Sequence, residues 1–296
     1  MRPAVLQTNA KDGLRHDFQE ADVMFRFFEP RQELKPYVRQ ICAIESPHGL
    51  PSSDRSVAAP NGCPKLIFPY ENTVTSIVGQ GTFESQERHL YFMGVRDTPA
   101  LVRTSSRRTG CLGIEFYPFG AYSIFEIPMD ESINGLVDIN VYLPKWRGEI
   151  TQTLENLNTL EERISFIQDR LIELRRKNQV ENRIVKYCVD SLKLSDGLMT
   201  ISDLERKTNY SRRYLEILFR DHVGLSPKAL ADIFRFQKFY RKWALKRPYD
   251  EFKDELYKYY YDQAHFAKEF KRMTGFSPQH FMYEVSNEFG RQLTLR

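Results

Sequence analysis

The chain has 296 residues, of which 41% are hydrophobic and 28% are charged, so it is long enough to form two globular domains with separate cores. No apolar run approaches the roughly 20 residues that a transmembrane helix requires, which argues against a helical membrane protein. The net charge of +4 is unevenly distributed, because residues 180–296 hold 22 Lys and Arg against 16 Asp and Glu. This basic excess suits contacts with phosphate groups, although an ordinary solvated surface would give the same balance.

Residues 1–22 are polar and lack the apolar segment of a signal peptide, so we expect a flexible leader there. The four cysteines, Cys42, Cys63, Cys111 and Cys188, are far apart and show no Cys-x-x-Cys spacing. Isolated cysteines of this kind are typical of buried, reduced thiols, and a disulfide or a metal site is the less favoured alternative. We therefore expect a soluble, cytoplasmic protein that does not enter a membrane.

From residue 23 to about residue 120 the sequence consists of short apolar runs separated by turn residues. Repeated short strands at this spacing predict a mostly-β barrel or sandwich, similar to a cupin, which we interpret as a sensor domain. The strand candidates are residues 37–44, 65–69, 74–78, 89–94, 101–104 and 111–117.

A small β-barrel can also house a metal-dependent enzyme, which needs histidines and a carboxylate at fixed spacing. The six histidines form no His-x-His pair, and only His89 lies well inside the predicted strands. We therefore expect neither enzymatic activity nor a bound metal or other cofactor. Arg96 and Glu115 lie beside or within apolar runs, and we interpret them as an internal ion pair or as solvent-facing residues, not as effector ligands.

Seven apolar residues spaced three or four apart predict one long helix near residues 154–174. They are Leu154, Leu157, Leu160, Ile164, Ile167, Leu171 and Leu174. The stripe packs on its own barrel, on a second copy of the chain in a homodimer, or on both along different parts of its length, and the sequence favours neither of the first two alternatives. Because only helix and turn patterns follow, we expect a domain boundary near residue 178, between a sensor and dimerisation domain (23–178) and a second domain (179–296).

The pattern Phe-x-x-x-x-Gly-x-Ser-Pro occurs twice in the second domain. The first copy consists of Phe219, Gly224, Ser226 and Pro227, and the second copy, at an offset of 51 residues, consists of Phe270, Gly275, Ser277 and Pro278. The apolar residues Leu215 and Phe266 share this offset. Matching residue types at one constant offset predict a helical unit that is used twice.

Around the first copy the sequence predicts two helices joined by a tight turn. Residues 201–208 have helical apolar spacing, and Asn209 suits the left-handed conformation of the turn. Ser211 is a favourable N-cap for a second helix that ends at Gly224, as in a helix-turn-helix. The predicted elements are a first helix-turn-helix over about residues 201–223, a linker helix over 228–246 and a second helix-turn-helix over about 250–273.

At these residues the chain resembles the AraC/XylS family of bacterial transcription regulators. The resemblance rests on the Gly-Leu-Ser-Pro and Gly-Phe-Ser-Pro sequences, on Asp262-Gln-Ala-His-Phe266 and on the 51-residue offset, and it covers about residues 180–285. It implies two helix-turn-helix units that enter adjacent segments of the DNA major groove. A weaker resemblance to the sensor domain of one subgroup of this family rests on residues 60–68, 94–96 and 113–121.

The resemblance also implies roles for individual positions. Base-facing positions fall on Arg213, Glu216 and Ile217 in the first unit and on Gln263, Ala264 and Lys268 in the second, with Arg212, Arg220, Lys271 and Arg272 as candidate phosphate contacts. Ser211, Asp262 and His265 complete the predicted DNA-binding set, and a structural role suits His265 better than direct readout. Gln and Lys side chains are suited to base edges and phosphates.

Several positions depart from the family pattern. Ile217 stands where the family usually has Arg, and Glu205 and Glu255 replace small residues of the supporting helices. In the second unit Asp254 falls on an apolar position and Tyr259 on the turn glycine. Either the supporting helix of the second unit is degenerate, or its register is off by one residue.

The leading hypothesis is a sequence-specific DNA-binding transcription regulator. The resemblance favours an activator that binds double-stranded DNA, contacts RNA polymerase and responds to a small-molecule effector. The alternative hypothesis is a protein-interaction regulator in which DNA binding has weakened.

Overall fold

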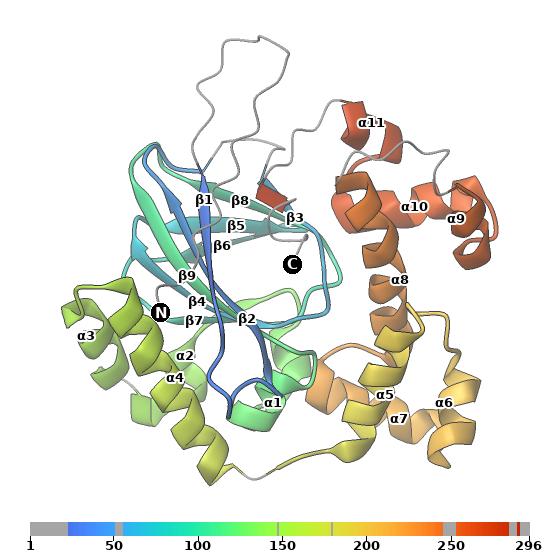
Figure 1. Ribbon diagram of the computed structural model, residues 1–296, viewed down its shortest axis with the longest axis horizontal. Helices are drawn as coiled ribbons and strands as arrows, with labels where there is room; N and C mark the ends of the chain where they lie inside the picture. The colour runs from blue at the N-terminus through green and yellow to red at the C-terminus, as the bar shows by residue number, and fades with distance from the viewer. Residues whose placement is uncertain are drawn as a thin grey trace.

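The computed structural model describes residues 23–50, 56–146, 148–178, 180–244, 253–283 and 289–290, and the predicted leader lies outside these residues. Figure 1 shows a part rich in strands with helices packed on it, residues 24–177, beside a separate group of helices, residues 183–283. We call these parts the β-region and the helical region. None of the described helices is long and apolar enough to cross a membrane.

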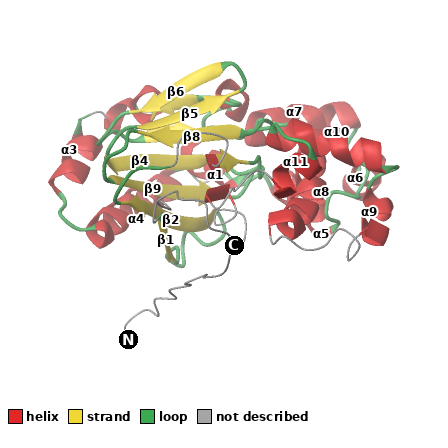
Figure 2. Cartoon of the chain, turned by 90° about the horizontal axis from the view of Figure 1, so that it is seen from above, coloured by secondary structure: helices red, strands yellow, loops and turns green. Residues whose placement is uncertain are grey.

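The β-region contains two antiparallel sheets. The larger sheet has six strands in the order β1-β2-β9-β4-β7-β10, and the smaller has four in the order β3-β8-β5-β6. The strands are β1 (Met24–Phe28), β2 (Val38–Ser46), β3 (Val57–Ala58), β4 (Lys65–Glu71), β5 (Val74–Val78), β6 (Gly81–Ser85), β7 (Tyr91–Met93), β8 (Ala100–Thr104), β9 (Thr109–Phe116) and β10 (Leu136–Asp138). Figure 2 shows the smaller sheet lying over the larger one. The predicted cupin-like β-domain is confirmed, although its two sheets do not close into one continuous barrel.

Strand β9 lies at the centre of the larger sheet, between β2 and β4. Every residue of β9 is buried except Gly113, which is half-buried. A strand that is covered on both faces favours a continuous apolar sequence, and Cys111-Leu-Gly-Ile provides one. Glu115 is therefore placed in an environment where a carboxylate requires partners of opposite charge.

The β-region continues into helices that pack on the sheets. They are α1 (Gly120–Phe125), η2 (Met129–Ser132), α2 (Ile139–Tyr142), η3 (Pro144–Trp146), α3 (Glu149–Asn156) and α4 (Leu160–Lys177). The prediction of one continuous helix over residues 154–174 is wrong, because α3 ends before Leu157 and α4 begins after Thr159. The Thr159 hydroxyl accepts the backbone N–H of Glu162, whose carboxylate caps the Thr159 N–H in return, and this capping box starts a new helix.

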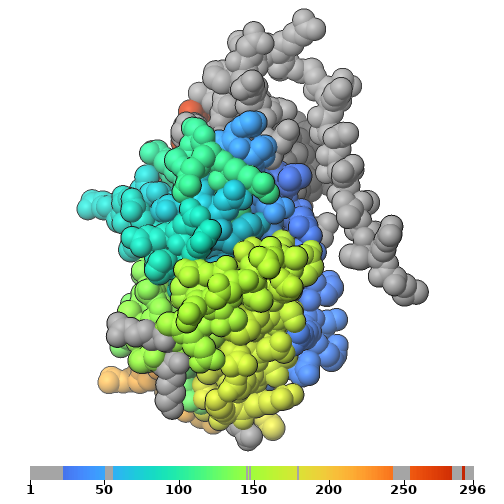
Figure 3. All heavy atoms as spheres, turned by 90° about the vertical axis from the view of Figure 1, so that its left-hand side faces the viewer, coloured from blue at the N-terminus to red at the C-terminus, as the bar shows by residue number. Residues whose placement is uncertain are grey.

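The apolar stripe on these two helices packs on the sheets of the same chain. Leu154, Leu160, Ile164, Ile167 and Leu171 are buried in one cluster with strand residues, and the other two leucines of the stripe pack at its edge. Burial of one such side chain contributes about 1.5–3 kcal/mol. Figure 3 shows α3 and α4, coloured green to yellow-green, directly beneath the strands. Of the two alternatives for the stripe, packing on the chain's own β-domain accounts for these buried residues.

The helical region contains the predicted repeat. Its helices are α5 (Arg183–Leu194), α6 (Ile201–Thr208), α7 (Arg212–Val223), α8 (Pro227–Ala244), α9 (Lys253–Tyr259), α10 (Gln263–Thr274) and α11 (Pro278–Tyr283). Unit 1 is α6 with α7, unit 2 is α9 with α10, and α8 joins them. Gly224 and Gly275 end α7 and α10 with φ of +86° and +85°, a left-handed conformation that glycine adopts without steric cost.

The two units differ at the turn between their helices. In unit 1, Asn209 has a φ of 59°, as predicted. In unit 2, Tyr259 does not have a positive φ, so it does not occupy a glycine-like turn position. The fully buried residue of α9 is Leu256, the counterpart of Leu204 in α6, whereas Asp254 is exposed. The buried position lies two residues beyond Asp254, so the predicted register differs by two residues rather than one, and α9 is not degenerate.

The β-region and the helical region share one apolar core. Val95 and Phe119 of the β-region are buried in the same cluster as Leu215, Phe219 and Val223 of α7. The α8 helix adds a polar contact, because the Gln237 side-chain amide donates to the Pro60 carbonyl oxygen at 2.6 Å. Unit 1 is thus fixed to the β-region by contacts that include α7, the second helix of the unit, which we call its recognition helix.

Candidate nucleic-acid interface

The second helices of the two units lie on the same side of α8. Figure 2 shows both of them on one side of α8, with α5 on the other. The α7 helix ends shortly before α8 begins, and α10 packs against the middle of α8, where Glu269 pairs with Arg235. This arrangement brings two recognition helices to one side of the helical region.

In unit 1 the residues predicted to face bases project outward from α7. Arg213, Glu216 and Ile217 are exposed, and Ile217 keeps 54% of its surface accessible although it is apolar. The Ser211 hydroxyl caps the helix by accepting the backbone N–H of Tyr214. Arg220 is exposed one turn further along the helix.

An ion pair fixes the side chains at the start of α7. The Arg212 Nε donates to Glu216 Oε1 at 2.9 Å, and the backbone N–H of Arg212 donates to Glu205 Oε1 at 2.7 Å. Glu205, which replaces a small residue of the family pattern, therefore connects the supporting helix to the recognition helix. By contrast, Arg213 forms no ion pair or side-chain hydrogen bond with any residue that the structure describes.

In unit 2 the predicted residues project from α10 in the same way. Asp262 is the N-cap, and its Oδ1 accepts the backbone N–H of His265 at 2.6 Å. The side chains of the remaining predicted residues, Gln263, Ala264, His265, Lys268, Lys271 and Arg272, are all exposed. The ring of His265 lies 5.4 Å from that of the buried Tyr260, which gives this histidine a structural contact.

A shallow pocket of about 400 Å³ separates the start of α8 from α10. Its lining includes Ser226, Lys228 and Asp232 on one side and His265, Lys268 and Arg272 on the other. Glu269 forms part of the floor, but it is buried and paired with Arg235 at 2.6 Å. Lys268 and Arg272, which were predicted to contact DNA, therefore lie on the exposed side of α10. Neither forms an ion pair with a carboxylate among the described residues.

Sequence reasoning missed the tyrosines that precede the two recognition helices. Tyr210 and Tyr261 each stand directly before an N-cap, and 92% of the surface of Tyr261 is exposed. The ring of Tyr210 stacks on that of Tyr214, with 4.9 Å between centroids. The 51-residue offset relates Tyr210 to Tyr261, so the repeat pattern could have indicated that both tyrosines belong to the repeated unit.

A second group of charged residues lies where the β-region faces α8. Glu115 is ion-paired with Arg39 and Lys65, and the Asn61 amide donates to its Oε2 at 2.9 Å. Burial alone would raise the pKa of Glu115, but the charges of Lys65 and Arg39 and the hydrogen bonds outweigh it and lower the pKa to about 2. Glu115 is therefore part of an internal ion pair, but its partners are Arg39 and Lys65 rather than Arg96, which donates to backbone carbonyl oxygens.

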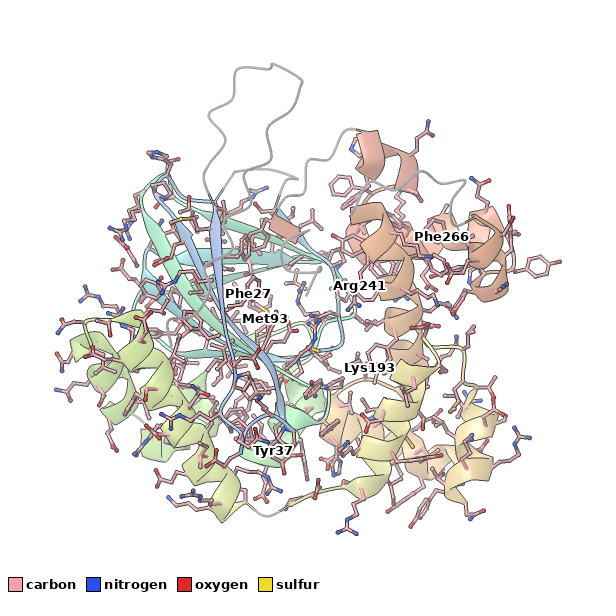
Figure 4. The ribbon with its side chains drawn as sticks, viewed as in Figure 1. Phe27, Tyr37, Met93, Lys193, Arg241 and Phe266 are labelled. Atoms are coloured by element: carbon pink, nitrogen blue, oxygen red, sulfur yellow. The ribbon has the colours of Figure 1, made fainter. Side chains whose placement is uncertain are left out.

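Two further arginines bring positive charge to the same junction. Arg96 donates to the Ala58 carbonyl oxygen at 2.9 Å, and burial lowers its pKa to about 10. The pKa of Arg241 in α8 is lowered by burial and by the nearby charge of Arg39. Figure 4 shows Arg241 and Lys193 between the β-region and the helices that carry them. The junction therefore holds more cations than anions.

The four cysteines are all buried, and Cys188 lies in the core of the helical region. Within the described ranges no group of three or more His, Cys, Asp or Glu residues could hold a metal ion.

Comparison with known proteins agrees with the geometry. Residues 204–283 match the helix-turn-helix domain family, and residues 26–138 match a family described as a domain of unknown function (DUF6597). No curated protein matches the sequence.

Several solved structures are similar to the chain at low sequence identity. Apo ToxT K231A from Vibrio cholerae strain SCE256 has 12% sequence identity and a TM-score of 0.44, and the match covers 83% of this chain and 97% of that one. ToxT from V. cholerae O395 bound to (E)-4-(8-methylnaphthalen-1-yl)but-3-enoic acid has 10% identity and a TM-score of 0.46, over 82% of this chain and 98% of that one. A cupin superfamily protein from Desulfitobacterium hafniense has 12% identity and a TM-score of 0.26, over 34% of this chain and 84% of that one.

The chain carries two helix-turn-helix units, α6 with α7 and α9 with α10, within the residues that match the helix-turn-helix domain family. Its helical region is an AraC-type helix-turn-helix domain, and the resemblance to the AraC/XylS family is confirmed there.

Proposed function

We propose that this regulator binds DNA sequence-specifically by placing α7 and α10 in two successive segments of the major groove. The observation that carries the proposal is that both helices lie on one side of α8 with their predicted base-facing residues exposed. Arg213 and Lys268 contact bases, and Arg212, Arg220, Lys271 and Arg272 contact phosphates. Tyr210 and Tyr261 add neutral hydroxyl donors for the phosphates beside each helix N-terminus.

A pull-down of genomic fragments with the purified full-length chain, repeated at two salt concentrations, tests this function. We expect a few fragments to be enriched at both concentrations, each with two short half-sites about one helical turn apart. Uniform enrichment that disappears at the higher salt concentration would contradict sequence-specific binding, because it reports only phosphate attraction.

We further propose that the β-region transmits an effector signal to unit 1. The support is the shared core, in which Val95 and Phe119 pack with residues of α7. The excess of cations at the junction suits a negatively charged effector. An effector that binds one arrangement of the two regions more tightly would shift the population of DNA-binding states. Thermal shift measurements with a panel of small anions test this part, and the expected result is stabilisation that Arg241→Ala abolishes.

Activation and contact with RNA polymerase rest on the family resemblance alone. A reporter whose promoter carries an enriched fragment tests them, and expression that rises when the chain is present is the expected result. A degenerate supporting helix in unit 2 would favour the alternative, an interaction regulator with weakened DNA binding. The α9 helix gives no such support, because it buries Leu256 as α6 buries Leu204.

A further inference from the structure

Among the acidic residues of the two recognition helices, one stands on the outer face. Helices α7 and α10, which are described throughout, contain Glu216, Asp221 and Glu269. Asp221 lies 3.2 Å from the ring of His222, and Glu269 is buried against Arg235. Glu216 is therefore the carboxylate that meets DNA when α7 enters the groove.

A carboxylate in the major groove weakens binding to most sequences. It is repelled by the phosphates, and it loses its water without gaining a hydrogen bond unless a base offers a donor. Glu216 is therefore expected to weaken binding to DNA sequences that offer no hydrogen-bond donor, rather than to raise affinity for all DNA. Unfavourable contacts of this kind give an interface specificity.

The geometry around Glu216 leaves one of its oxygens free for such a donor. Arg212 Nε holds Oε1 at 2.9 Å, and the backbone of Arg212 is itself held by Glu205. No hydrogen bond to a described residue occupies Oε2. The Glu216 side chain is thus fixed on one side and unpaired on the other.

Base chemistry selects the partner of this free oxygen. In the major groove, cytosine presents its N4 amino group as a donor, whereas adenine presents its N6 amino group next to the N7 acceptor, which repels a carboxylate. Guanine and thymine present acceptors there, and thymine adds a methyl group. Cytosine is therefore the base that satisfies Glu216.

We infer that Glu216, positioned by Arg212, is a specificity-determining residue that requires a C·G pair in the half-site read by unit 1. This inference rests on the proposed function. Between Gln263 and Thr274 of α10 the one carboxylate, that of Glu269, is buried, and Gln263 and Ala264 suit an A·T pair and a thymine methyl group. The two half-sites therefore differ, and only that of unit 1 contains the C·G pair set by Glu216.

Selection from randomised DNA duplexes tests the inference, with the full-length wild type, Glu216→Gln and Glu155→Gln. Glutamine pairs with adenine through N6 and N7, so Glu216→Gln is expected to change one C·G position of the selected motif to A·T. Glu155→Gln makes the same chemical change at an exposed position of α3 in the β-region and is expected to leave the motif unchanged. A Glu216→Gln motif identical to that of the wild type overturns the inference.

Direct binding measurements add a second readout. Glu216→Ala is expected to raise affinity for unrelated DNA and to lower the ratio of specific to non-specific affinity by about tenfold or more. A parallel fall in both affinities would identify Glu216 as a structural residue and overturn the inference. Failure of the proposed function itself looks different, because the wild type would then select no motif at all.

Discussion

Gly224, at the end of the recognition helix α7, lies directly against the backbone of Met129 in the β-region. A Cβ atom on Gly224 would stand 2.8 Å from the Met129 carbonyl oxygen and 2.9 Å from Cγ1 of Val95. Gly275 is the counterpart of Gly224 in unit 2 and has almost the same φ, but an added Cβ there would meet nothing within 4 Å. The glycine of unit 1 therefore has two roles, as a helix cap and as a contact between regions, whereas the glycine of unit 2 has only the first.

This pair permits a matched test of the contact between regions. Gly275→Ala is expected to lower the free energy of unfolding by about 1–2 kcal/mol, the cost of a left-handed conformation for alanine. Gly224→Ala is expected to cost about 1–3 kcal/mol more, because the methyl group also overpacks the junction. Urea unfolding of both variants measures the difference. Equal losses would show that the junction is not packed closely at Gly224.

The buried Glu115 predicts a loss of stability in acid. Its pKa is about 2 in the folded chain and 4.5 in the unfolded chain, so the unfolded state takes up the proton first as the pH falls. The stability that its charge provides, about 3 kcal/mol, is present above pH 4.5 and is lost as the pH falls towards 2.

Substitution of the same residue gives a sharper measurement. Glu115→Gln leaves Arg39 and Lys65 without their anion, and we expect the free energy of unfolding at neutral pH to fall by about 3–5 kcal/mol. Glu87→Gln is the control, because the Glu87–Arg107 pair is exposed and is expected to contribute less than about 1 kcal/mol. Similar losses for the two variants would contradict the buried character of the Glu115 site.

Local sequence signals were sufficient to predict the repeated unit. Ser211 and Asp262 were recognisable as N-caps and Gly224 and Gly275 as helix ends, because caps depend on the chemistry of a few adjacent residues. The break between α3 and α4 was missed because Leu157 continues the apolar spacing, although Thr159 and Glu162 form a readable capping box.

Other features depend on contacts between distant residues. The register of α9 follows from which of its side chains fills the core, and Leu256 rather than Asp254 does so. The contact of Gly224 with Met129 joins residues that are far apart in the sequence, so no local sequence pattern predicts it. The base-facing residues were predictable from the repeat and the family resemblance, whereas the Arg212–Glu216 pair required the structure.

His222 makes the junction sensitive to mild acid. Burial lowers the pKa of His222 below 6.5, and the nearby Asp221 and the hydrogen bond to the Leu218 carbonyl oxygen only partly oppose this shift. Its Nδ1 lies 3.0 Å from that oxygen and its ring centroid lies 4.0 Å from that of Tyr122 in α1, so the neutral ring connects α7 to the β-region.

Because the folded pKa is depressed, the unfolded chain binds the proton more readily, and stability is expected to fall as the pH drops below 6.5. Unfolding free energies of the wild type and His222→Gln, measured at about pH 7.5 and about pH 5.5, isolate this contribution. The fall between the two pH values is expected to be larger for the wild type. An equal fall in both proteins would assign the pH dependence to other groups.

Arg213 and Lys268 are expected to carry base contacts, one in each unit. Removal of either side chain with Arg213→Ala or Lys268→Ala is expected to weaken binding to an enriched operator by about 1–3 kcal/mol. A gel-shift titration measures the loss. Arg176→Ala, a change of the same type on the exposed side of α4, is the control and is expected to bind as the wild type does. Wild-type affinity in the Arg213 and Lys268 variants would contradict their assignment.

Tyr261 is expected to bind the DNA backbone through its hydroxyl group. Its side chain is 92% exposed, directly before the N-cap of α10, where phosphates approach a recognition helix. Tyr261→Phe removes only the hydroxyl, and we expect operator and unrelated DNA to bind more weakly by a similar factor, about 0.5–1.5 kcal/mol. Because tyrosine carries no charge, the dependence of affinity on salt should stay unchanged, whereas Lys271→Ala should reduce that slope by about 1. Tyr187→Phe on α5, on the opposite side of α8, is the matched control, and an equal effect there would show that Tyr261 has no special contact with DNA.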